Sequence, residues 1–262
     1  ADRLKMADPL LVGVDGGGTH CRVRIRRLDG SLLGQAEGGT ANVFAGVEPA
    51  LRTIVETVRA ALVSGGDAGD ALPRCIVGLG LAGANVPSVA AEVRATPLPF
   101  AASALESDAF AACRGAFAGA DGAIAILGTG SAYALRVKGE RRILGGYGMI
   151  VSDHASGADL GRRALAAALL AHDGFGPVSD LTFALMARFD GSPYAITEFA
   201  RDAKPRDFGG LAPLVWDHAD TGDAVALRLV EEGLSIFEAS ARRCLDLGAP
   251  AIALLGGQAA RY

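Results

Sequence analysis

Two short glycine-rich loops, each leading from one apolar strand to the next, constrain this chain more than any other feature. The first is Asp15-Gly16-Gly17-Gly18-Thr19 and the second is Gly128-Thr129-Gly130-Ser131. Glycine removes the Cβ from a turn, so that backbone N–H groups can face an anion closely. Either loop alone is compatible with an ordinary glycine-rich hairpin. Two matched loops predict two backbone surfaces that grip the ends of one polyphosphate.

The first loop differs from two widespread phosphate-binding motifs. It lacks the Gly-Lys-Ser/Thr ending of a P-loop, and a strand rather than a helix follows it, unlike the dinucleotide-binding turn. Thr19 adds a hydroxyl donor. Asp15 adds a carboxylate suited to hold Mg²⁺ through water.

The chain repeats one arrangement, once from Leu10 and once from Gly122. Each time a buried strand, a glycine loop, a strand, a turn and a further strand are followed by helices and strands. This duplication predicts an α/β fold of two domains with a cleft between them, which we place at 1–106 and 107–262.

Hydrophobic spacing predicts the other elements. Helices are expected at 49–63, 87–94, 109–117, 156–171 and from Asp223 to Gly248, with short helices over 173–222 and strands at 75–81, 102–105 and 251–255. Ser156 with Asp159 resembles a capping box. In the longest helix, apolar residues recur every three or four positions: Leu227, Val230, Leu234, Phe237, Ala241 and Leu245.

Composition excludes several classes of protein. Glycine contributes 36 of 262 residues, roughly twice its usual share, yet half of the chain is apolar and the glycines have no period of three. This excludes a disordered tail and collagen. A formal net charge of −4 without long basic clusters argues against nucleic acid as a partner, and the absence of an apolar run of about 20 residues argues against a membrane span.

The four cysteines lie too far apart in the sequence for a structural zinc or iron–sulfur site. They are Cys21, Cys75, Cys113 and Cys244, none in a C-x-x-C pair. Their apolar neighbours predict small core residues in a reducing compartment. We therefore expect a cytoplasmic protein.

The paired loops do not stand alone. Together with the segments Glu106-Ser107-Asp108-Ala109 and Leu255-Gly256-Gly257-Gln258, they resemble the actin-like ATPase superfamily of sugar kinases. Within it the chain looks like the BadF/BadG-type ATPases that include N-acetylglucosamine kinase and glucosamine kinase. The resemblance runs from Leu10 to the last residue and implies two duplicated actin-like domains, a homodimer and one more helix after Tyr262.

The resemblance implies roles for matching positions. The family's phosphate loops match Asp15–Thr19 and Gly128–Ser131, with Asp15 at the metal. ATP would be bound by Gly16, Gly17, Gly18, Thr19, Gly128, Thr129, Gly130, Ser131, Gly256, Gly257 and Gln258. The catalytic aspartate, which takes the proton from the sugar 6-hydroxyl, matches Asp108, and phosphoryl transfer needs such an oriented acceptor. Asp108 is also placed to cap the following helix, a structural role that is compatible with catalysis.

The sugar site implied by the resemblance comprises Asn42, Asp108, Thr129, Gly130, Tyr147 and Asp153. The amide of Asn42 can donate to and accept from a sugar hydroxyl, although a turn residue would look the same in the sequence. Tyr147 offers an aromatic face, and Asp153 a carboxylate for hydroxyls.

The chain departs from the family pattern at two places. His154-Ala155 stands where the family has Glu-Gly after the aspartate, which puts the role of that glutamate in doubt. His20 stands where many relatives carry Lys or Arg. We interpret His154 as a residue behind the sugar site rather than a ligand.

Two other functions are compatible with parts of the sequence. Activators of radical dehydratases share an iron–sulfur cluster through a cysteine beside a glycine-rich loop, a setting that neither Cys75 nor Cys113 has. A non-catalytic, nucleotide-gated protein is favoured only by the loss of Glu-Gly. We therefore expect an ATP- and Mg²⁺-dependent kinase for the 6-hydroxyl of an amino sugar, N-acetylglucosamine first and glucosamine second.

Overall fold

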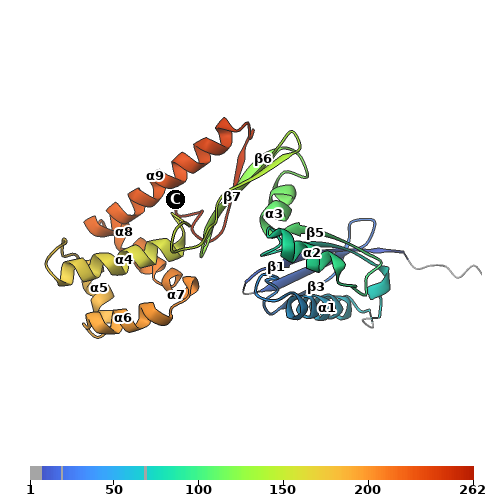
Figure 1. Ribbon diagram of the computed structural model, residues 1–262, viewed down its shortest axis with the longest axis horizontal. Helices are drawn as coiled ribbons and strands as arrows, with labels where there is room; N and C mark the ends of the chain where they lie inside the picture. Colours follow the sequence, from blue (N-terminus) through green and yellow to red (C-terminus); the bar gives the residue numbers. More distant parts are fainter. Residues whose placement is uncertain (1–7, 19, 68–69) are drawn as a thin grey trace, which may run out of the picture. The chain divides into compact units, whose positions relative to one another are not determined.

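Each half of the chain builds a mixed β-sheet around its own first strand in the computed structural model, which describes residues 8–18, 20–67 and 70–262 (Figure 1). The first sheet has the order β3-β2-β1-β4-β5, and the second has the order β8-β7-β6-β9. In both, three consecutive strands pair antiparallel, and a later strand returns parallel to the first. The predicted duplication is therefore present.

The chain divides into two compact units, Ala1–Gly115 and Ala116–Tyr262. The domain limits expected from the sequence stay a prediction, as does the cleft. Thr19 lies outside the described residues.

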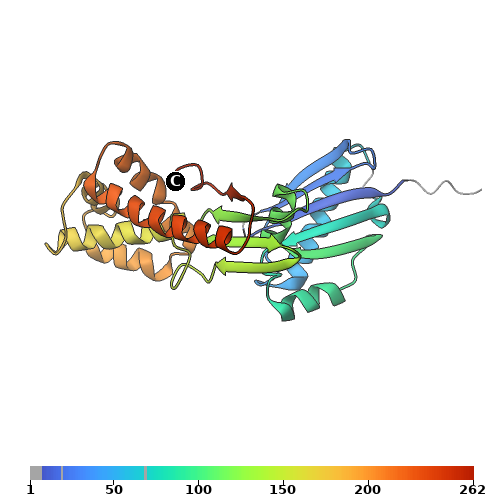
Figure 2. The ribbon, with the colours of Figure 1, turned by 90° about the horizontal axis from the view of Figure 1, so that it is seen from above.

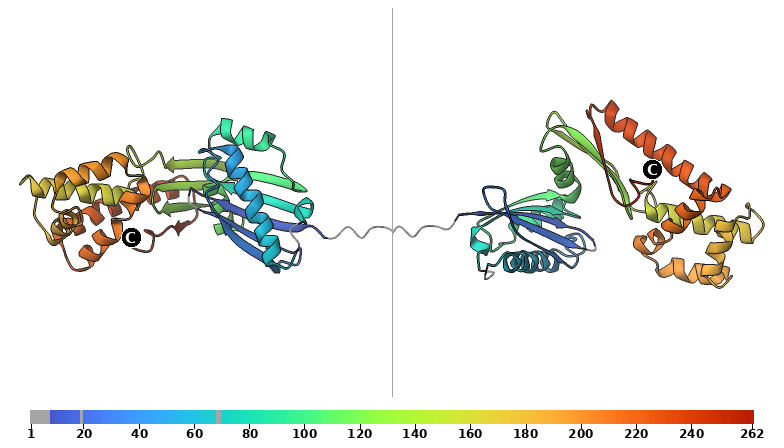
Figure 3. Two further views of the ribbon diagram at one scale, coloured as in Figure 1. Left: turned by 90° about the horizontal axis from the view of Figure 1, so that it is seen from below. Right: turned by 180° about the vertical axis from the view of Figure 1, so that it is seen from behind.

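The first unit contains five strands and three α-helices among the residues described. These are β1 (Leu10–Gly16), β2 (Cys21–Arg26), β3 (Leu32–Gly38), α1 (Val47–Ser64), the short 3₁₀ helix η1 (Leu72–Arg74), β4 (Cys75–Leu81), α2 (Pro87–Ala95), β5 (Ala102–Ser107) and α3 (Asp108–Ala116). Helix α1 lies across one face of the sheet (Figure 3, left) and buries Leu51, Ile54 and Val58 against alternate residues of β1 and β2. Alternating burial in β1 and β2 follows from the two-residue period of a strand.

The second unit combines a sheet with a helical cluster. Its elements are β6 (Gly122–Leu127), β7 (Ser131–Val137), β8 (Glu140–Gly145), α4 (Gly157–His172), α5 (Asp180–Arg188), α6 (Pro193–Asp202), α7 (Pro205–Gly209), α8 (Ala212–Asp220), α9 (Ala224–Asp246) and β9 (Ile252–Leu255). Helix α9 runs beside the strands (Figure 2), where Cys244 packs with Ala125 and Tyr133. Helices α4 to α9 share a second core.

Helix α9 is confirmed, but its buried stripe differs from the apolar repeat read in the sequence. Asp223 caps the helix by accepting from the N–H groups of Val225 and Ala226. Leu227, Leu234 and Leu245 are 39, 40 and 50% exposed, whereas the buried residues are Val225, Ala226, Leu229, Gly233 and Cys244. Apolar residues cover a wide arc of this helix, and tertiary packing selected one stripe within that arc.

The capping box predicted at α4 is only half formed. Ser156 Oγ accepts from the Asp159 N–H at 3.1 Å, as expected. The Asp159 carboxylate instead accepts from Arg162 and Arg163, both at 3.1 Å. Charged donors one turn along the helix compete successfully for a buried carboxylate.

All four cysteines are buried, so their prediction as core residues is confirmed. Burial raises the pKa of the thiols of Cys21, Cys75 and Cys244. In the part of the chain that the structure describes, no helix combines the length and the apolar character that crossing a membrane requires.

Candidate functional site

In the first unit, the predicted metal-binding Asp15 is the last residue but one of β1, and the predicted catalytic Asp108 directly follows β5. Both strands run parallel to β4, which lies between them. Gly16 of β1 pairs with Leu81 of β4, which in turn pairs with Ser107 of β5. Because parallel strands finish at the same edge of a sheet, Asp15 and Asp108 are brought to that edge together.

Asp108 is the first residue of α3 and is partly buried there. Burial raises the pKa of its carboxyl, the negative charge of Asp15 raises it further, and a hydrogen bond from the Ala109 N–H opposes both. That bond, to Asp108 Oδ1, is 2.8 Å long. Asp108 is therefore a carboxylate with increased proton affinity, which suits a general base.

The helix cap at α3 is made by Ser107 rather than by Asp108. Ser107 Oγ accepts from the Phe110 N–H, three residues on, at 3.3 Å. Ser107, one residue before the position expected, therefore makes the cap, while the Asp108 carboxylate accepts from the first-turn N–H of Ala109.

Gly80 of β4 allows α3 to lie directly on the sheet. A Cβ at Gly80 would lie 2.7 Å from Ala111 Cβ and 3.3 Å from the Val14 carbonyl oxygen. Since no side chain fits there, the start of α3 is held close to β1 and its Asp15. Gly80 was not foreseen as a site residue, although a glycine inside an apolar strand is a signal of close approach.

The glycines of the first loop do different things. A Cβ at Gly16 would lie 2.6 Å from Leu81 Cδ2 and 3.1 Å from Ala41 Cβ, so this glycine serves packing. The Gly17 N–H donates to the His20 carbonyl at 2.9 Å, inside the turn. A Cβ at Gly18 would have no neighbour within 4 Å. Gly18 therefore leaves the most open backbone in this loop.

Asn42 lies in an Asx turn, because its Oδ1 accepts from the Phe44 N–H at 2.9 Å. The turn residue and the predicted sugar ligand are compatible, since this bond uses the oxygen and leaves the Nδ2 donors. Gly83, with φ of +89°, keeps space beside this amide: a Cβ there would lie 2.9 Å from Asn42 Oδ1.

In the second unit, the start of α4 holds the second glycine loop. The Gly157 N–H donates to the Gly128 carbonyl at 2.8 Å, and the Ala158 N–H donates to the Thr129 carbonyl at 3.1 Å. Ser131 Oγ donates to the His154 carbonyl at 2.7 Å and is therefore occupied within the unit. The loop is fixed by hydrogen bonds to its carbonyls, which favours a preorganised turn.

Asp153 lies against this loop. Its Oδ1 accepts from the Gly148 N–H at 3.1 Å, and a Cβ on Gly130 would lie 2.6 Å from its Oδ2. Burial raises the pKa of the Asp153 carboxyl, opposed by the Gly148 hydrogen bond and the nearby His154. Three predicted site elements are thus neighbours: the second loop, the 145–148 turn and Asp153. Tyr147, in that turn, is 74% exposed.

We expect Gly130→Ala to reduce kcat/KM about tenfold or more, because its methyl group would push the Asp153 carboxylate aside. Gly115→Ala is the control, since a Cβ there also meets nothing within 4 Å and Gly115 lies in α3 outside the proposed binding residues. Steady-state assays of both variants measure the difference. Equal activities would mean that the contact between Gly130 and Asp153 does not matter for turnover.

The predicted adenosine loop is tied to the end of β6. The Gln258 N–H donates to the Leu127 carbonyl at 2.8 Å, and the Trp216 indole donates to Gln258 Oε1 at 2.6 Å. A Cβ at Gly256, whose φ is +97°, would overlap the Leu127 carbonyl, whereas Gly257 is open. Trp216, which is the chain's single tryptophan, was not foreseen as a support of this loop.

Comparisons with known proteins agree on one family. The model of the BadF/BadG/BcrA/BcrD ATPase family matches residues 12–246. Glucosamine kinase GspK of Vibrio cholerae is 39% identical over 250 residues, which cover 95% of this chain and 85% of the relative. An N-acetylmuramic acid/N-acetylglucosamine kinase of Clostridium acetobutylicum is 30% identical over 169 residues, 62% of this chain and 54% of the relative.

A solved structure from Chromobacterium violaceum, provisionally described as an N-acetylglucosamine kinase, superimposes with a TM-score of 0.88. It is 34% identical and covers 97% of this chain and 89% of its own. The α/β fold of two duplicated domains expected from the sequence is therefore confirmed.

Proposed function

Because the chain belongs to the BadF/BadG/BcrA/BcrD ATPase family, we propose that it transfers a phosphoryl group from ATP to the 6-hydroxyl of an amino sugar, with glucosamine ahead of N-acetylglucosamine. Phosphorylation of an amino sugar is the activity named for relatives at 39 and 30% identity. The order expected from the sequence was N-acetylglucosamine first and glucosamine second. We reverse it because the glucosamine kinase matches 95% of this chain and the N-acetylmuramic acid/N-acetylglucosamine kinase only 62%.

The observation that carries the proposal is the environment of Asp108. A partly buried carboxylate with a raised pKa, beside a second carboxylate at the carboxyl edge of a parallel sheet, is suited to accept a proton from a bound hydroxyl. The Ala109 N–H fixes one carboxylate oxygen and leaves the other for the sugar. In this proposal Asp108 orients the 6-hydroxyl and takes its proton as the oxygen attacks the γ-phosphorus.

The glycine loops and the remaining site residues bind and orient in this proposal. Gly18 in the first loop and Gly128 in the second have open space where a Cβ would stand, so their backbone can approach phosphate oxygens. Asn42, through Nδ2, and Asp153, through its carboxylate, hydrogen-bond sugar hydroxyls. Gly257 lies against the adenosine.

A Mg²⁺ ion accompanying ATP fits Asp15. This side chain is exposed, and its charge contributes to the raised pKa of Asp108, so a cation held by Asp15 would offset that repulsion. Mg²⁺ is usually held by one or two carboxylates, waters and substrate phosphates rather than by a cage of side chains. When bound, the ion offsets charge on the phosphate oxygens.

A coupled assay of ADP release across glucose, glucosamine, N-acetylglucosamine and N-acetylmannosamine tests the substrate. We expect kcat/KM for glucosamine to exceed that for each other sugar by about tenfold or more, because a site built for an ammonium group discriminates against an amide or a hydroxyl. A higher kcat/KM for N-acetylglucosamine than for glucosamine would instead support the order of substrates expected from the sequence. If no sugar stimulates ATP consumption while ATP still binds, the kinase proposal fails and the nucleotide-gated alternative takes its place.

A further inference from the structure

The two ends of the Gln258 side-chain amide lie in different surroundings. The Trp216 indole donates to Oε1 at 2.6 Å. Because an indole nitrogen is a donor and never an acceptor, this bond determines which way round the amide lies. Nε2 therefore occupies the other side of the amide, and it has no hydrogen-bond acceptor among the residues that the structure describes. Gln258 is only partly buried, so the N–H groups of Nε2 are available to a ligand.

Nε2 lies beside the start of α4, where the second glycine loop is held. A Cβ at Gly157 would stand 3.1 Å from Nε2 and 3.4 Å from the Gly128 carbonyl oxygen. The Gly157 N–H donates to that carbonyl, and a Cβ at Gly128 would meet nothing within 4 Å. A side-chain donor and the open backbone of the second loop are therefore neighbours.

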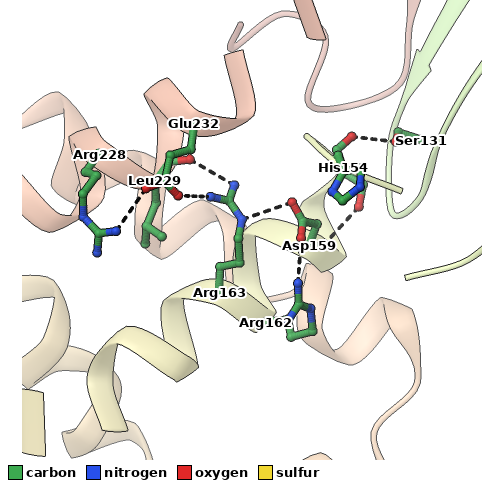
Figure 4. A network of polar contacts seen from close by, with 9 residues as sticks. Ser131, His154, Asp159, Arg162, Arg163, Arg228, Leu229 and Glu232 are labelled. Atoms are coloured by element: carbon green, nitrogen blue, oxygen red, sulfur yellow. Dashed lines mark hydrogen bonds and ion pairs between the residues drawn. The ribbon is translucent and has the colours of Figure 1, made fainter. Parts of the chain in front are cut away.

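Figure 4 shows the polar network that fixes the start of α4. The Asp159 carboxylate accepts from Arg163 Nε at 3.1 Å, and Arg163 Nη1 donates to Glu232 of α9 at 2.8 Å. Just before the helix, the His154 carbonyl accepts from Ser131 Oγ of the second loop at 2.7 Å. The start of α4 is thus anchored to α9 and to the loop, so that the surface beside Nε2 is preorganised.

Trp216, on the other side of the amide, is also fixed. It is 6% exposed, and the ring of Tyr262 packs edge-on against it with the centroids 5.1 Å apart. The guanidinium of Arg261 lies 5.1 Å from the centroid of the Trp216 ring and donates to Asp220 at 2.6 Å. The indole N–H is therefore held in one direction, toward Gln258.

We propose that Trp216 is a positioning residue of the nucleotide site, which turns the Gln258 amide so that Nε2 donates to a phosphate oxygen of ATP at the second loop. The opposite orientation would present Oε1, an acceptor that repels an anion. The Ser131 hydroxyl is occupied by the His154 carbonyl, so Nε2 supplies a side-chain donor that Ser131 does not. This inference rests on the proposed function, which supplies ATP as the ligand.

Calorimetric titration of the whole chain in the absence of sugar tests the contact, with adenosine and ATP as probes. Trp216→Phe keeps an aromatic ring against Tyr262 but removes the donor that orients the amide. We expect the Kd for ATP to rise about fivefold or more, because a hydrogen bond to a charged group is weakened, and the Kd for adenosine to change less than about twofold. Equal weakening of both probes would mean that Trp216 only supports the loop, and the proposal would be wrong.

Gln258→Glu tests the amide itself and covers the case in which Trp216→Phe does not fold. The new side chain still offers an acceptor to the indole, and the backbone bond to the Leu127 carbonyl is kept. An oxygen then stands in place of Nε2, so we expect ATP to bind about tenfold or more weakly and adenosine to change less than about twofold. Unchanged binding of ATP would show that Nε2 does not contact a phosphate.

Gln35→Glu is the matched control, because it makes the same chemical change on β3 of the first unit, where the side chain is exposed. It should leave both Kd values within about twofold of the parent's. If it weakens ATP as much as Gln258→Glu does, the effect is one of net charge, and the proposed contact is wrong.

Steady-state kinetics separates this contact from a general structural role. Trp216→Phe should raise the KM for ATP about fivefold while kcat and the KM for the sugar stay within about twofold, since the hydrogen bond is present in the ground state and the transition state alike. A fall in kcat at an unchanged KM for ATP would contradict the proposal. The titrations need neither sugar nor turnover, so a parent that binds ATP but phosphorylates no sugar disproves the proposed function and leaves the contact to be judged by the variants.

Discussion

Asp108→Asn is expected to lower kcat/KM for the amino sugar by about 10²- to 10⁴-fold, the usual contribution of a positioned general base. The amide oxygen of asparagine can still accept the 2.8 Å hydrogen bond from the Ala109 N–H, so the start of α3 keeps its geometry. Asparagine can also still hydrogen-bond the sugar hydroxyl, but it cannot take the proton. The KM for the sugar should therefore change much less than kcat in the coupled ADP-release assay.

The chain contains a matched control in Asp180. Like Asp108, it is the first residue of a helix and follows a serine that accepts from the N–H three residues on, here Ser179 and Thr182. Asp180→Asn should leave activity unchanged. If both variants lose activity equally, the loss at Asp108 belongs to the helix start rather than to catalysis.

The stability of the parent protein and of Asp108→Asn should depend on pH differently, and the direction of this difference follows from the raised pKa of Asp108. Burial and Asp15 raise the pKa of Asp108 above its ordinary value, so the native state retains a proton that the unfolded chain has already released. The free energy of unfolding therefore falls as pH rises through this interval, and the charged side chain destabilises the protein at neutral pH. Asp108→Asn removes this cost, so we expect a Tm above that of the parent at neutral pH and a smaller difference in acid. Activity of the parent should rise with pH over the same interval, as its base loses the proton.

Much of the fold could be predicted because the determining signals are local. The strands β1, β4 and β6 are short, mostly apolar runs that contain glycine, and a capping aspartate precedes α9. Such local signals could not predict which face of α9 is buried. Leu227 and Leu234 have the correct spacing and remain exposed, because the choice among neighbouring stripes depends on what packs against the helix.

The glycine-rich loops of the candidate site could be predicted from the sequence, but the residues that hold these loops and Asp108 in place could not. The glycine loops at Gly16 and Gly128 are visible in the residue order, whereas Asp108 was assigned through the family resemblance. The capping role of Ser107, the close approach at Gly80 and the bond from Trp216 to Gln258 depend on residues far apart in the chain or on atomic detail. A glycine in the sequence marks close approach but does not say which neighbour requires it.

Gly256→Ala is expected to destabilise the second unit by about 3 kcal/mol or more. The φ of +97° at this residue is strained for any residue with a Cβ, and the added methyl group would overlap the Leu127 carbonyl at the end of β6. Relief would require the loop after β9 to move away from β6 and release the hydrogen bond of Gln258 to Leu127. Urea unfolding, followed by the fluorescence of Trp216, which is bonded to Gln258, measures the change where the loop is anchored.

Gly257→Ala separates stability from nucleotide binding, because a Cβ there meets nothing within 4 Å. We expect its Tm without ligand to stay close to that of the parent. If the backbone of Gly257 lies against adenosine, the methyl group occupies space that ATP needs, and the rise in Tm on adding ATP should shrink, since that rise grows with ligand concentration divided by Kd. An unchanged ATP-induced rise would remove Gly257 from the nucleotide site. Because Gly256 is required by the fold and Gly257 is not, only the second of these adjacent glycines reports on the ligand.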